Sequence, residues 1–203
     1  MRRYLVYIIL GIALGLAIIA AIVFARPYTL RGSVLMPPVP APEISLTAGD
    51  GSPWRLSDHK GQVVMIFFGY TTCPDVCPAT LGEMQALREQ LGEKLARDVQ
   101  VVFITVDPQR DTPERLAKYV TAFDPTFTGL SGTEEALQPI WSAYGVYREI
   151  RPNASGATYL VDHTARTYVI DRAGNLRLSY SFGTPLDDLL QDTKFLLKEK
   201  VQP

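Results

Sequence analysis

The first pattern along the chain is an uncharged, apolar segment near its amino terminus. Tyr4–Ala25 holds 22 residues, mostly Ile, Leu, Ala and Val, and follows Arg2 and Arg3. A bilayer core about 30 Å thick needs roughly 20 helical residues, whereas a cleaved signal peptide has a shorter apolar core. We therefore predict an uncleaved membrane anchor over residues 1–25, although Val23–Ala25 is an acceptable cleavage site. The basic flank predicts that the rest of the chain lies on the outer, periplasmic or extracytoplasmic face.

A proline-rich segment separates this anchor from the remainder of the chain. Residues 26–42 contain five prolines in 17 positions. Such a composition favours extended polyproline II, which rises about 3.1 Å per residue and acts as a semi-rigid spacer. We expect a linker over residues 26–42 and one globular domain over residues 43–203, in which no internal repeat is visible.

Within the domain, hydrophobic periodicity predicts alternating strands and helices. The continuous apolar runs Val63–Phe68 and Val99–Val106 are typical of strands buried on both faces. Between them, apolar residues recur at helical spacing: Leu81, Met84, Leu87, Leu91 and Leu95. The remaining elements are, in chain order, a hairpin within Glu43–Leu56, helices at Thr112–Ala122 and Thr133–Ala143, strands at Thr167–Ile170 and Leu176–Tyr180, and a helix from Thr184 to about Lys200.

This order of elements predicts an α/β protein with a thioredoxin-like fold. Two strand–helix units followed by a hairpin and a closing helix give a mixed central sheet with helices on both faces. The junction of the first central strand with its helix lies at the carboxyl end of that strand, where open α/β sheets form their sites. Cys73 and Cys77 lie at this junction.

Cys73 and Cys77 are the only cysteines of the chain, and they are four residues apart. A disulfide stabilises most when it closes a long loop, so a purely structural bridge is the weaker interpretation here. Pro78 suits a first helical position, which would make Cys77 the helix cap. Because a helix amino terminus lowers the pKa of a thiol, we expect reactive thiolates that form a reversible disulfide or bind a soft metal ion.

The two histidines differ in their predicted positions. Two thiolates suit Cu(I), whereas a Cu(II) or zinc site also needs a nitrogen ligand. His59 lies in a polar turn, and we expect it to be exposed to solvent. His163 precedes the predicted strand Thr167–Ile170, and in a thioredoxin-like fold the loop before that strand faces the cysteine loop. His163 is therefore the predicted third ligand.

Three segments of the chain together resemble the Sco/SenC family of membrane-anchored copper proteins: Gly69–Pro78, Val106–Pro108 with Asp111–Pro113, and Val161–Thr164. The resemblance extends over about residues 44–197. It implies copper bound by Cys73, Cys77 and His163, thiols that can also cycle through a disulfide, and the proximity of Asp75 and Asp107 to the site without a direct ligand role. Many relatives carry histidine where this chain has Thr72, which removes an auxiliary nitrogen but leaves the three ligands.

The predicted site and the family resemblance lead to two hypotheses of function, which belong to different classes. The leading hypothesis is a metallochaperone that binds Cu(I) or Cu(II), receives it from a further copper donor protein, and assists assembly of the CuA centre of cytochrome c oxidase at the CuA-bearing subunit. The alternative is a thiol–disulfide oxidoreductase that reduces the cysteines of that copper site, and peroxidase chemistry is a weaker third reading. With 20 Lys and Arg against 21 Asp and Glu and no basic run, nucleic-acid binding has no electrostatic support.

Overall fold

The computed structural model describes residues 2–24, 28–152 and 159–199, and the chain divides into two compact units, Met1–Leu30 and Arg31–Pro203. The first unit consists mainly of one helix, α1 (Arg2–Phe24), which coincides with the predicted anchor. Across the described residues, no helix combines the length and the apolar character that crossing a membrane requires. The predicted membrane span is therefore not confirmed by the structure.

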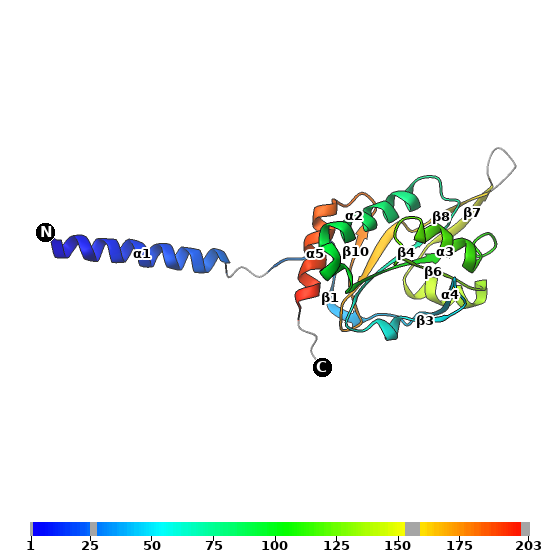
Figure 1. Ribbon diagram of the computed structural model, residues 1–203, viewed down its shortest axis with the longest axis horizontal. Helices are drawn as coiled ribbons and strands as arrows, with labels where there is room; N and C mark the ends of the chain where they lie inside the picture. The colour runs from blue at the N-terminus through cyan, green and yellow to red at the C-terminus, as the bar shows by residue number, and fades with distance from the viewer. Residues whose placement is uncertain (1, 25–27, 153–158, 200–203) are drawn as a thin grey trace. The chain divides into compact units, whose positions relative to one another are not determined.

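The second unit is built on an eight-stranded mixed sheet with the strand order β1-β10-β9-β4-β5-β6-β2-β3 (Figure 1). Strands β4, β5 and β6 run parallel to one another, and the remaining neighbours pair antiparallel. The strands are β1 (Ser33–Pro40), β2 (Ser45–Ala48), β3 (Pro53–Arg55), β4 (Val63–Gly69), β5 (Val99–Thr105), β6 (Thr128–Ser131), β9 (Arg166–Ile170) and β10 (Asn175–Ser181). The mixed sheet and the predicted hairpin, now β2 and β3, are confirmed.

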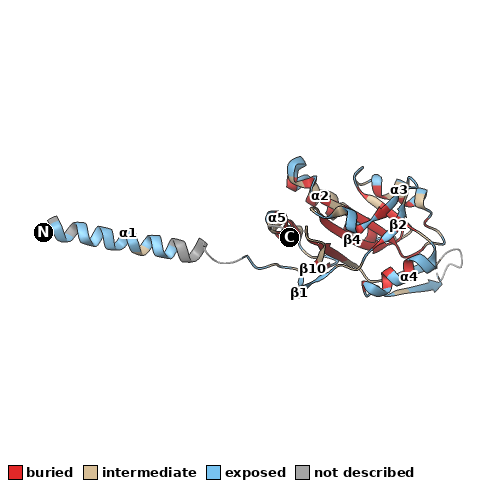
Figure 2. Cartoon of the chain, turned by 90° about the horizontal axis from the view of Figure 1, so that it is seen from below, coloured by how far each residue is buried: buried red, intermediate tan, exposed pale blue. Residues whose placement is uncertain are grey.

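Helices cover both faces of this sheet. They are α2 (Val76–Ala96), α3 (Pro113–Thr121), α4 (Glu134–Ala143) and α5 (Leu186–Lys198), with a short 3-10 helix, η1 (Leu56–His59). Successive side chains of a strand point to opposite faces. Phe67 of β4 therefore lies beside Phe103 on the face covered by α2, α3 and α5, whereas Phe68 packs against Tyr144 at the end of α4. All of β4 is buried, as the red strands of Figure 2 show.

Part of the proline-rich segment, predicted to be a semi-rigid spacer, belongs to the central sheet. Ser33–Pro40 forms β1, the edge strand of the sheet, and pairs with β10. An edge strand needs hydrogen bonds on only one side, so proline is tolerated there. The pairing is interrupted between Val34 and Val39, which leaves Pro37 and Pro38 outside the regular ladder. Residues 25–27 of the predicted anchor and linker lie outside the described residues.

The helix that follows the cysteines begins earlier than predicted. It starts at Val76 with Asp75 as the preceding cap residue, so Cys77 lies inside the first turn and is not the cap. The first-turn N–H groups have no partner within a helix, so Pro78 is accepted as the third helical residue. The predicted end of the last helix at Lys200 lies outside the described residues.

Besides β1, the sequence pattern missed three further strands: β6, β7 (Arg148–Pro152) and β8 (Tyr159–His163). Strands β7 and β8 form a separate two-stranded sheet. Both are short and mostly exposed, so they lack the apolar alternation by which a strand is recognised. As a result His163 is the last residue of a strand and does not lie in an irregular loop.

Candidate metal site

The two cysteines are positioned by the end of β4 and the start of α2. Cys73 lies in the connecting loop and is partly exposed, whereas Cys77 lies in the first turn of α2 and is fully buried. The N–H of Cys73 donates to the carbonyl of Tyr70 at 3.2 Å, which folds the loop back on itself. The exposed sulfur can therefore meet a partner molecule, and the buried sulfur is held by the protein core.

Gly69 makes the space that the Cys77 sulfur occupies, a role that the sequence pattern did not reveal. A Cβ atom at this position would lie 2.7 Å from Cys77 Sγ and 2.7 Å from Cζ of Phe103. Any side chain larger than hydrogen would push the sulfur away from its place. The only signal in the sequence is that glycine ends an otherwise bulky apolar strand, directly before the cysteine loop.

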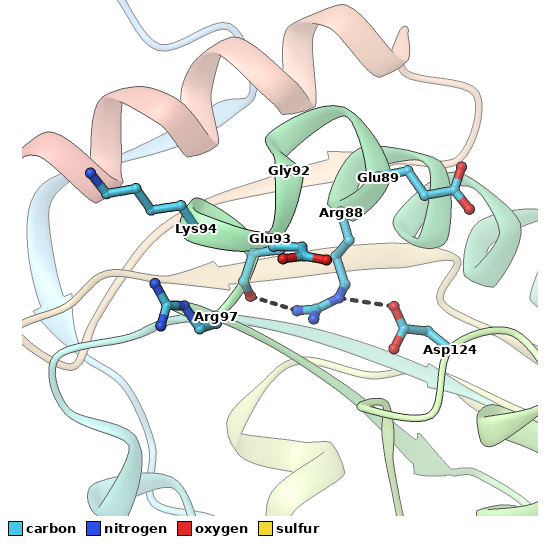
Figure 3. Close-up of a pocket in the computed structure, with 8 residues that line it drawn as sticks. Arg88, Glu89, Gly92, Glu93, Lys94, Arg97 and Asp124 are labelled. Atoms are coloured by element: carbon cyan, nitrogen blue, oxygen red, sulfur yellow. Dashed lines mark hydrogen bonds and ion pairs between the residues drawn. The ribbon is translucent and has the colours of Figure 1, made fainter.

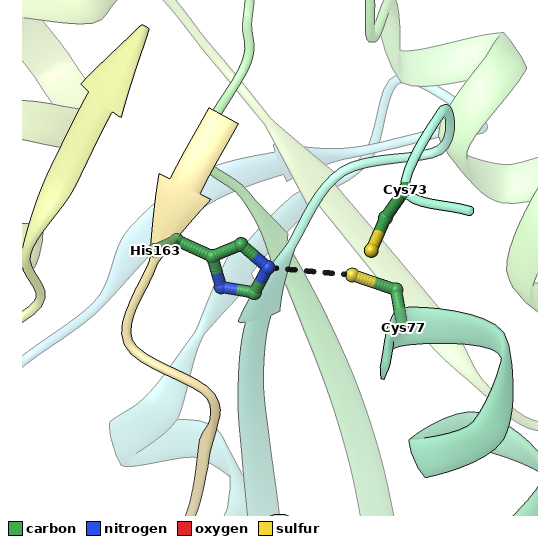
Figure 4. Close-up of side chains that lie close together, drawn as sticks. All are labelled: Cys73, Cys77 and His163. Atoms are coloured by element: carbon green, nitrogen blue, oxygen red, sulfur yellow. Dashed lines mark hydrogen bonds between the residues drawn. The ribbon is translucent and has the colours of Figure 1, made fainter. Parts of the chain in front are cut away.

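His163 meets the cysteines across the end of the sheet (Figure 4). Its Nε2 atom lies 3.6 Å from Cys77 Sγ, and the ligand atoms of Cys73, Cys77 and His163 all lie within 4.8 Å of one another. Nδ1 lies 3.3 Å from the carbonyl of Thr164. In the tautomer with its proton on Nδ1, the Nε2 lone pair faces the sulfurs, as a metal ligand requires. The structure thus brings the three predicted residues together.

Aromatic rings fix the orientation of the imidazole. The rings of Tyr70 and Phe67 meet the ring of His163 edge-on, with centroid separations of 5.7 Å and 6.0 Å. Tyr70 is buried, and burial raises the pKa of its hydroxyl. The site therefore has an apolar wall on the side of the sheet, which excludes water from one flank of the three ligand atoms.

The two thiols have opposite proton affinities. The hydrogen bond from the Cys77 thiol stabilises the Cys73 thiolate and lowers the pKa of Cys73 to about 3, with His163 adding a smaller effect. The pKa of Cys77 is raised because it donates that bond and is buried. At neutral pH the pair therefore holds one proton on the buried sulfur and presents a thiolate on the exposed one. The expectation of reactive thiolates holds for Cys73 only.

The cavity beside the site has a volume of about 310 Å³ and includes Cys73, Asp75 and His163 in its lining. The predicted proximity of Asp75 is therefore confirmed. Asp107 does not line this cavity; it is fully buried, the Tyr159 hydroxyl donates to it at 2.7 Å and Arg110 forms an ion pair with it. Asp107 is thus linked to the site through neighbouring side chains.

His59 takes no part in the site. Its ring stacks on Trp54 with a centroid separation of 4.7 Å, and its Nδ1 lies 2.9 Å from Oε1 of Gln62. The side chain is half-buried, so the prediction that His59 is exposed to solvent was wrong. His59 covers the apolar ring surface of Trp54, which explains why this histidine is directed inward although its turn is polar.

Asp111 holds the cysteine loop in place. The sequence identifies this residue only as part of a motif that resembles the Sco/SenC family. Its carboxylate accepts hydrogen bonds from the Thr71 N–H at 3.0 Å, the Thr71 hydroxyl at 2.5 Å and the Thr105 hydroxyl at 2.8 Å. The carboxylate is fully buried, and this burial raises the pKa of Asp111. Asp111 therefore anchors the loop two residues before Cys73.

A larger cleft, of about 820 Å³, lies elsewhere, at the kinked end of α2 (Figure 3). Arg88, one of the two arginines that line it, forms an ion pair with Asp124 at 3.0 Å and donates to the carbonyls of Ala96 and Val99 at 2.7 Å and 2.5 Å. These bonds join the end of α2 to the neighbouring segments. The cleft therefore reflects a structural junction, and the chemically distinctive residues lie at the cysteine site.

Comparisons with known proteins agree on one family. The SCO1/SenC family matches residues 40–198. The mitochondrial SCO1 homologue of mouse is 40% identical over 131 residues, which cover 64% of this chain and 46% of the mouse protein. The chain thus spans about half the length of that relative.

Solved structures give the same result. Apo Sco1 of Thermus thermophilus is 41% identical, with a TM-score of 0.75 over 84% of this chain and 98% of that one. ScoI of Bradyrhizobium japonicum with copper bound is 35% identical, with a TM-score of 0.71 over 78% of this chain and 100% of that one. A thioredoxin family protein of Chlorobium tepidum shares the fold alone, which agrees with the predicted thioredoxin-like architecture. It is 21% identical, with a TM-score of 0.54 over 79% of this chain and 97% of that one. On its sequence, its fold and its pair of cysteines with one histidine, this chain belongs to the SCO1/SenC family.

Proposed function

We propose that this protein carries copper as a metallochaperone and passes it to the CuA centre of cytochrome c oxidase during assembly. The observation that carries the proposal is the meeting of Cys73, Cys77 and His163, whose ligand atoms lie within 4.8 Å of one another. Soft thiolates suit Cu(I), and the added imidazole suits Cu(II). Membership of the SCO1/SenC family and the copper bound in Bradyrhizobium japonicum ScoI support this choice of metal.

Copper is the cargo in this proposal, and the three ligands have unequal access to a partner. Cys73 and His163 line the open cavity, whereas Cys77 is fully buried. An incoming thiolate from a partner would replace the exposed ligands first and the Cys77 thiolate last. Such stepwise exchange keeps the ion coordinated throughout transfer. We propose the CuA-bearing oxidase subunit as acceptor and a further copper protein as donor.

A copper titration of the full-length reduced chain tests the proposal. We expect one Cu(I) and one Cu(II) per chain in separate titrations, with thiolate-to-Cu(II) charge-transfer absorption. His163→Ala should abolish or shift that absorption, because the nitrogen ligand is lost. His59→Ala is the matched control and should behave as the unaltered protein, since His59 is stacked on Trp54 away from the site. Equal Cu(II) spectra in all three proteins would refute the three-ligand site.

A second candidate function is thiol–disulfide exchange, favoured by the lowered pKa of Cys73 and the neighbouring thiol of Cys77. The Cys73 thiolate would attack a partner disulfide, forming a mixed disulfide and releasing one partner thiolate. Cys77, losing its proton to solvent, would then attack Cys73 Sγ and release the second partner thiolate. The partner gains two electrons, and this chain is left with a Cys73–Cys77 disulfide. His163→Ala should leave this exchange largely intact, and Cys77→Ala should arrest it at the mixed disulfide.

We also propose that the chain is anchored by its amino-terminal helix, with the Sco domain on the outer face of the membrane. Support comes from the uncharged segment Tyr4–Ala25 and from the exposed apolar side chains of α1, among them Leu10 and Leu14. Apolar side chains exposed along a helix favour transfer from water into an apolar environment. Extraction of isolated membranes with alkaline carbonate should leave the full-length chain in the pellet. Release of the uncleaved chain into the supernatant would refute the anchor.

A further inference from the structure

The imidazole of the proposed site is carried by a hairpin that stands apart from the central sheet. His163 ends β8, and in the described part of the chain the backbone partner of β8 is β7. The cysteines, by contrast, follow β4 in the middle of the sheet. Backbone pairing constrains His163 from its carboxyl side alone, where Thr164 and Ala165 lead into β9, which pairs with β4. The rest of the hairpin is held against the core by side chains.

Several side chains make this connection, among them Arg148 of β7, which donates to the carbonyl of Val106, and Tyr159 at the other end of β8. The hydroxyl of Tyr159 donates to Oδ1 of Asp107 at 2.7 Å, and its carbonyl accepts a hydrogen bond from Nη1 of Arg110 at 2.8 Å. The guanidinium of Arg110 lies 3.7 Å from the centroid of the Tyr159 ring and also pairs with Asp107. Asp107 is fully buried, so this carboxylate is a fixed point in the core.

Asp107 and Arg110 belong to the segment 106–112 between β5 and α3, and this segment also holds the cysteine side of the site. Asp111 accepts two hydrogen bonds from Thr71, while Asp107 and Arg110, a few residues earlier, hold Tyr159. Arg110 also lies 5.7 Å from the ring of Tyr70. One short connection, residues 106–112, therefore contacts both the loop that carries Cys73 and the hairpin that carries His163.

We propose that Tyr159 and Arg110 are positioning residues which, through Asp107, set the distance between the His163 imidazole and the cysteine sulfurs. The inference rests on the proposed function, because it assigns a consequence to copper binding. Groups that orient a metal ligand typically contribute about 10–100-fold to metal affinity. Tyr159→Phe removes one hydroxyl and keeps the ring, so we expect a loss of about 10-fold in Cu(II) affinity, at the lower end of that range. Cu(I) affinity should stay within about 3-fold, because two thiolates suffice for Cu(I).

The chain offers a matched control on the same hairpin. Tyr147, just before β7, donates its hydroxyl to Glu149 within the hairpin and has no such connection to Asp107. Tyr147→Phe makes the same chemical change and should leave both affinities and the Cu(II) spectrum unaltered. Arg110→Lys is a second variant that keeps the charge but loses the planar group stacked on Tyr159, and it should weaken Cu(II) binding in the same direction.

The test uses the full-length chain and two readouts. The first is chelator competition for Cu(I) and Cu(II) together with the electron paramagnetic resonance spectrum of the Cu(II) form. The second is amide hydrogen exchange of the metal-free protein, in which Tyr159→Phe should speed exchange at Val161, whose N–H donates to the Tyr70 hydroxyl, and leave Ile66 of β4 unchanged.

A selective loss of Cu(II) affinity with faster exchange in the hairpin would support the inference. Three results would overturn it: unchanged affinity and exchange in Tyr159→Phe, equal losses of Cu(I) and Cu(II), or the same losses in Tyr147→Phe. Failure of the unaltered chain to bind copper through His163 would refute the proposed function instead. In that case the exchange data would still decide whether Tyr159 anchors the hairpin.

Discussion

Replacing Gly69 by alanine tests how closely the core is built around the buried sulfur. The added Cβ would lie 2.7 Å from Cys77 Sγ, 2.7 Å from Cζ of Phe103 and 2.9 Å from its Cε2. Carbon and sulfur atoms at such separations repel strongly, so α2 or the phenyl ring must move. Both neighbours are fully buried and lie in a closely packed region, which leaves little room for adjustment.

The magnitude follows from the cost of overpacking. Extra methyl groups in a packed core typically cost about 1–3 kcal/mol. For a domain of this size, each kcal/mol lowers the melting temperature by about 2–4 °C, so we expect a fall of about 4–8 °C for a cost near 2 kcal/mol. Displacing Cys77 Sγ also separates it from His163 Nε2, now 3.6 Å away, so Cu(I) and Cu(II) affinity should both fall.

Differential scanning calorimetry of the metal-free chain and a Cu(I) competition titration measure the two effects. Gly82→Ala is the matched control, because no heavy atom other than those of its chain neighbours and of the nearby backbone of α2 lies within 4 Å of the position its Cβ would take. Alanine is favoured over glycine within a helix by roughly 0.5–1 kcal/mol, so this variant should melt at a slightly higher temperature and bind copper normally. Melting and copper affinity in Gly69→Ala equal to those of the unaltered chain would refute the reasoning.

Three further outcomes are expected. The rate of alkylation of Cys73, measured by mass spectrometry, should stay nearly constant from about pH 5 to pH 8, because its lowered pKa keeps it a thiolate throughout. Cys77→Ala removes the thiol that donates a hydrogen bond to Cys73, and this variant should show a steep fall of the rate toward low pH. Because the folded state lowers the pKa of Cys73, the stabilising contribution of its thiolate is present above the unfolded-state pKa and is lost as the pH falls through about 3. Urea unfolding should therefore show a larger loss of stability on Cys73→Ala at pH 7 than near pH 3. An equal loss at both pH values would contradict the assignment. Arg88→Met should lower the free energy of unfolding by about 2–4 kcal/mol, since it removes the ion pair with Asp124 and the donor to two carbonyls, yet copper affinity should not change. A loss of copper affinity would show that the cleft near α2 communicates with the site.

Much of the fold could be predicted because its central elements carry strong local signals. Strand β4 is a continuous apolar run, and α3 and α4 each begin with a threonine whose hydroxyl caps the first turn, at Thr112 and Thr133. Such signals depend on residues close together in the chain. Strands β1 and β7 carry no comparable signal, because an edge strand and a mostly exposed strand satisfy no alternating pattern.

The candidate site divides in the same way. Cys73 and Cys77 could be identified as a pair because they are neighbours in the sequence, and His163 followed once the fold was assumed. The helix start at Val76 was placed two residues too late, because a first-turn proline is compatible with several positions. The roles of Gly69, Asp111 and Tyr159 could not be predicted, since each depends on a contact with a residue that lies far away along the chain or on another element.

The sequence by itself determined the chain order of the helices and of most sheet strands, the pair of thiols and the family of the chain, because these depend on local periodicity and on short motifs. Only the tertiary structure decided that the proline-rich segment becomes an edge strand and that His163 is carried by a separate hairpin. It alone decided that Cys77 is buried while Cys73 is accessible, which is what gives the two thiols opposite proton affinities. Burial and hydrogen bonding between distant segments are properties of the packed chain, and no spacing of residues along the sequence encodes them directly.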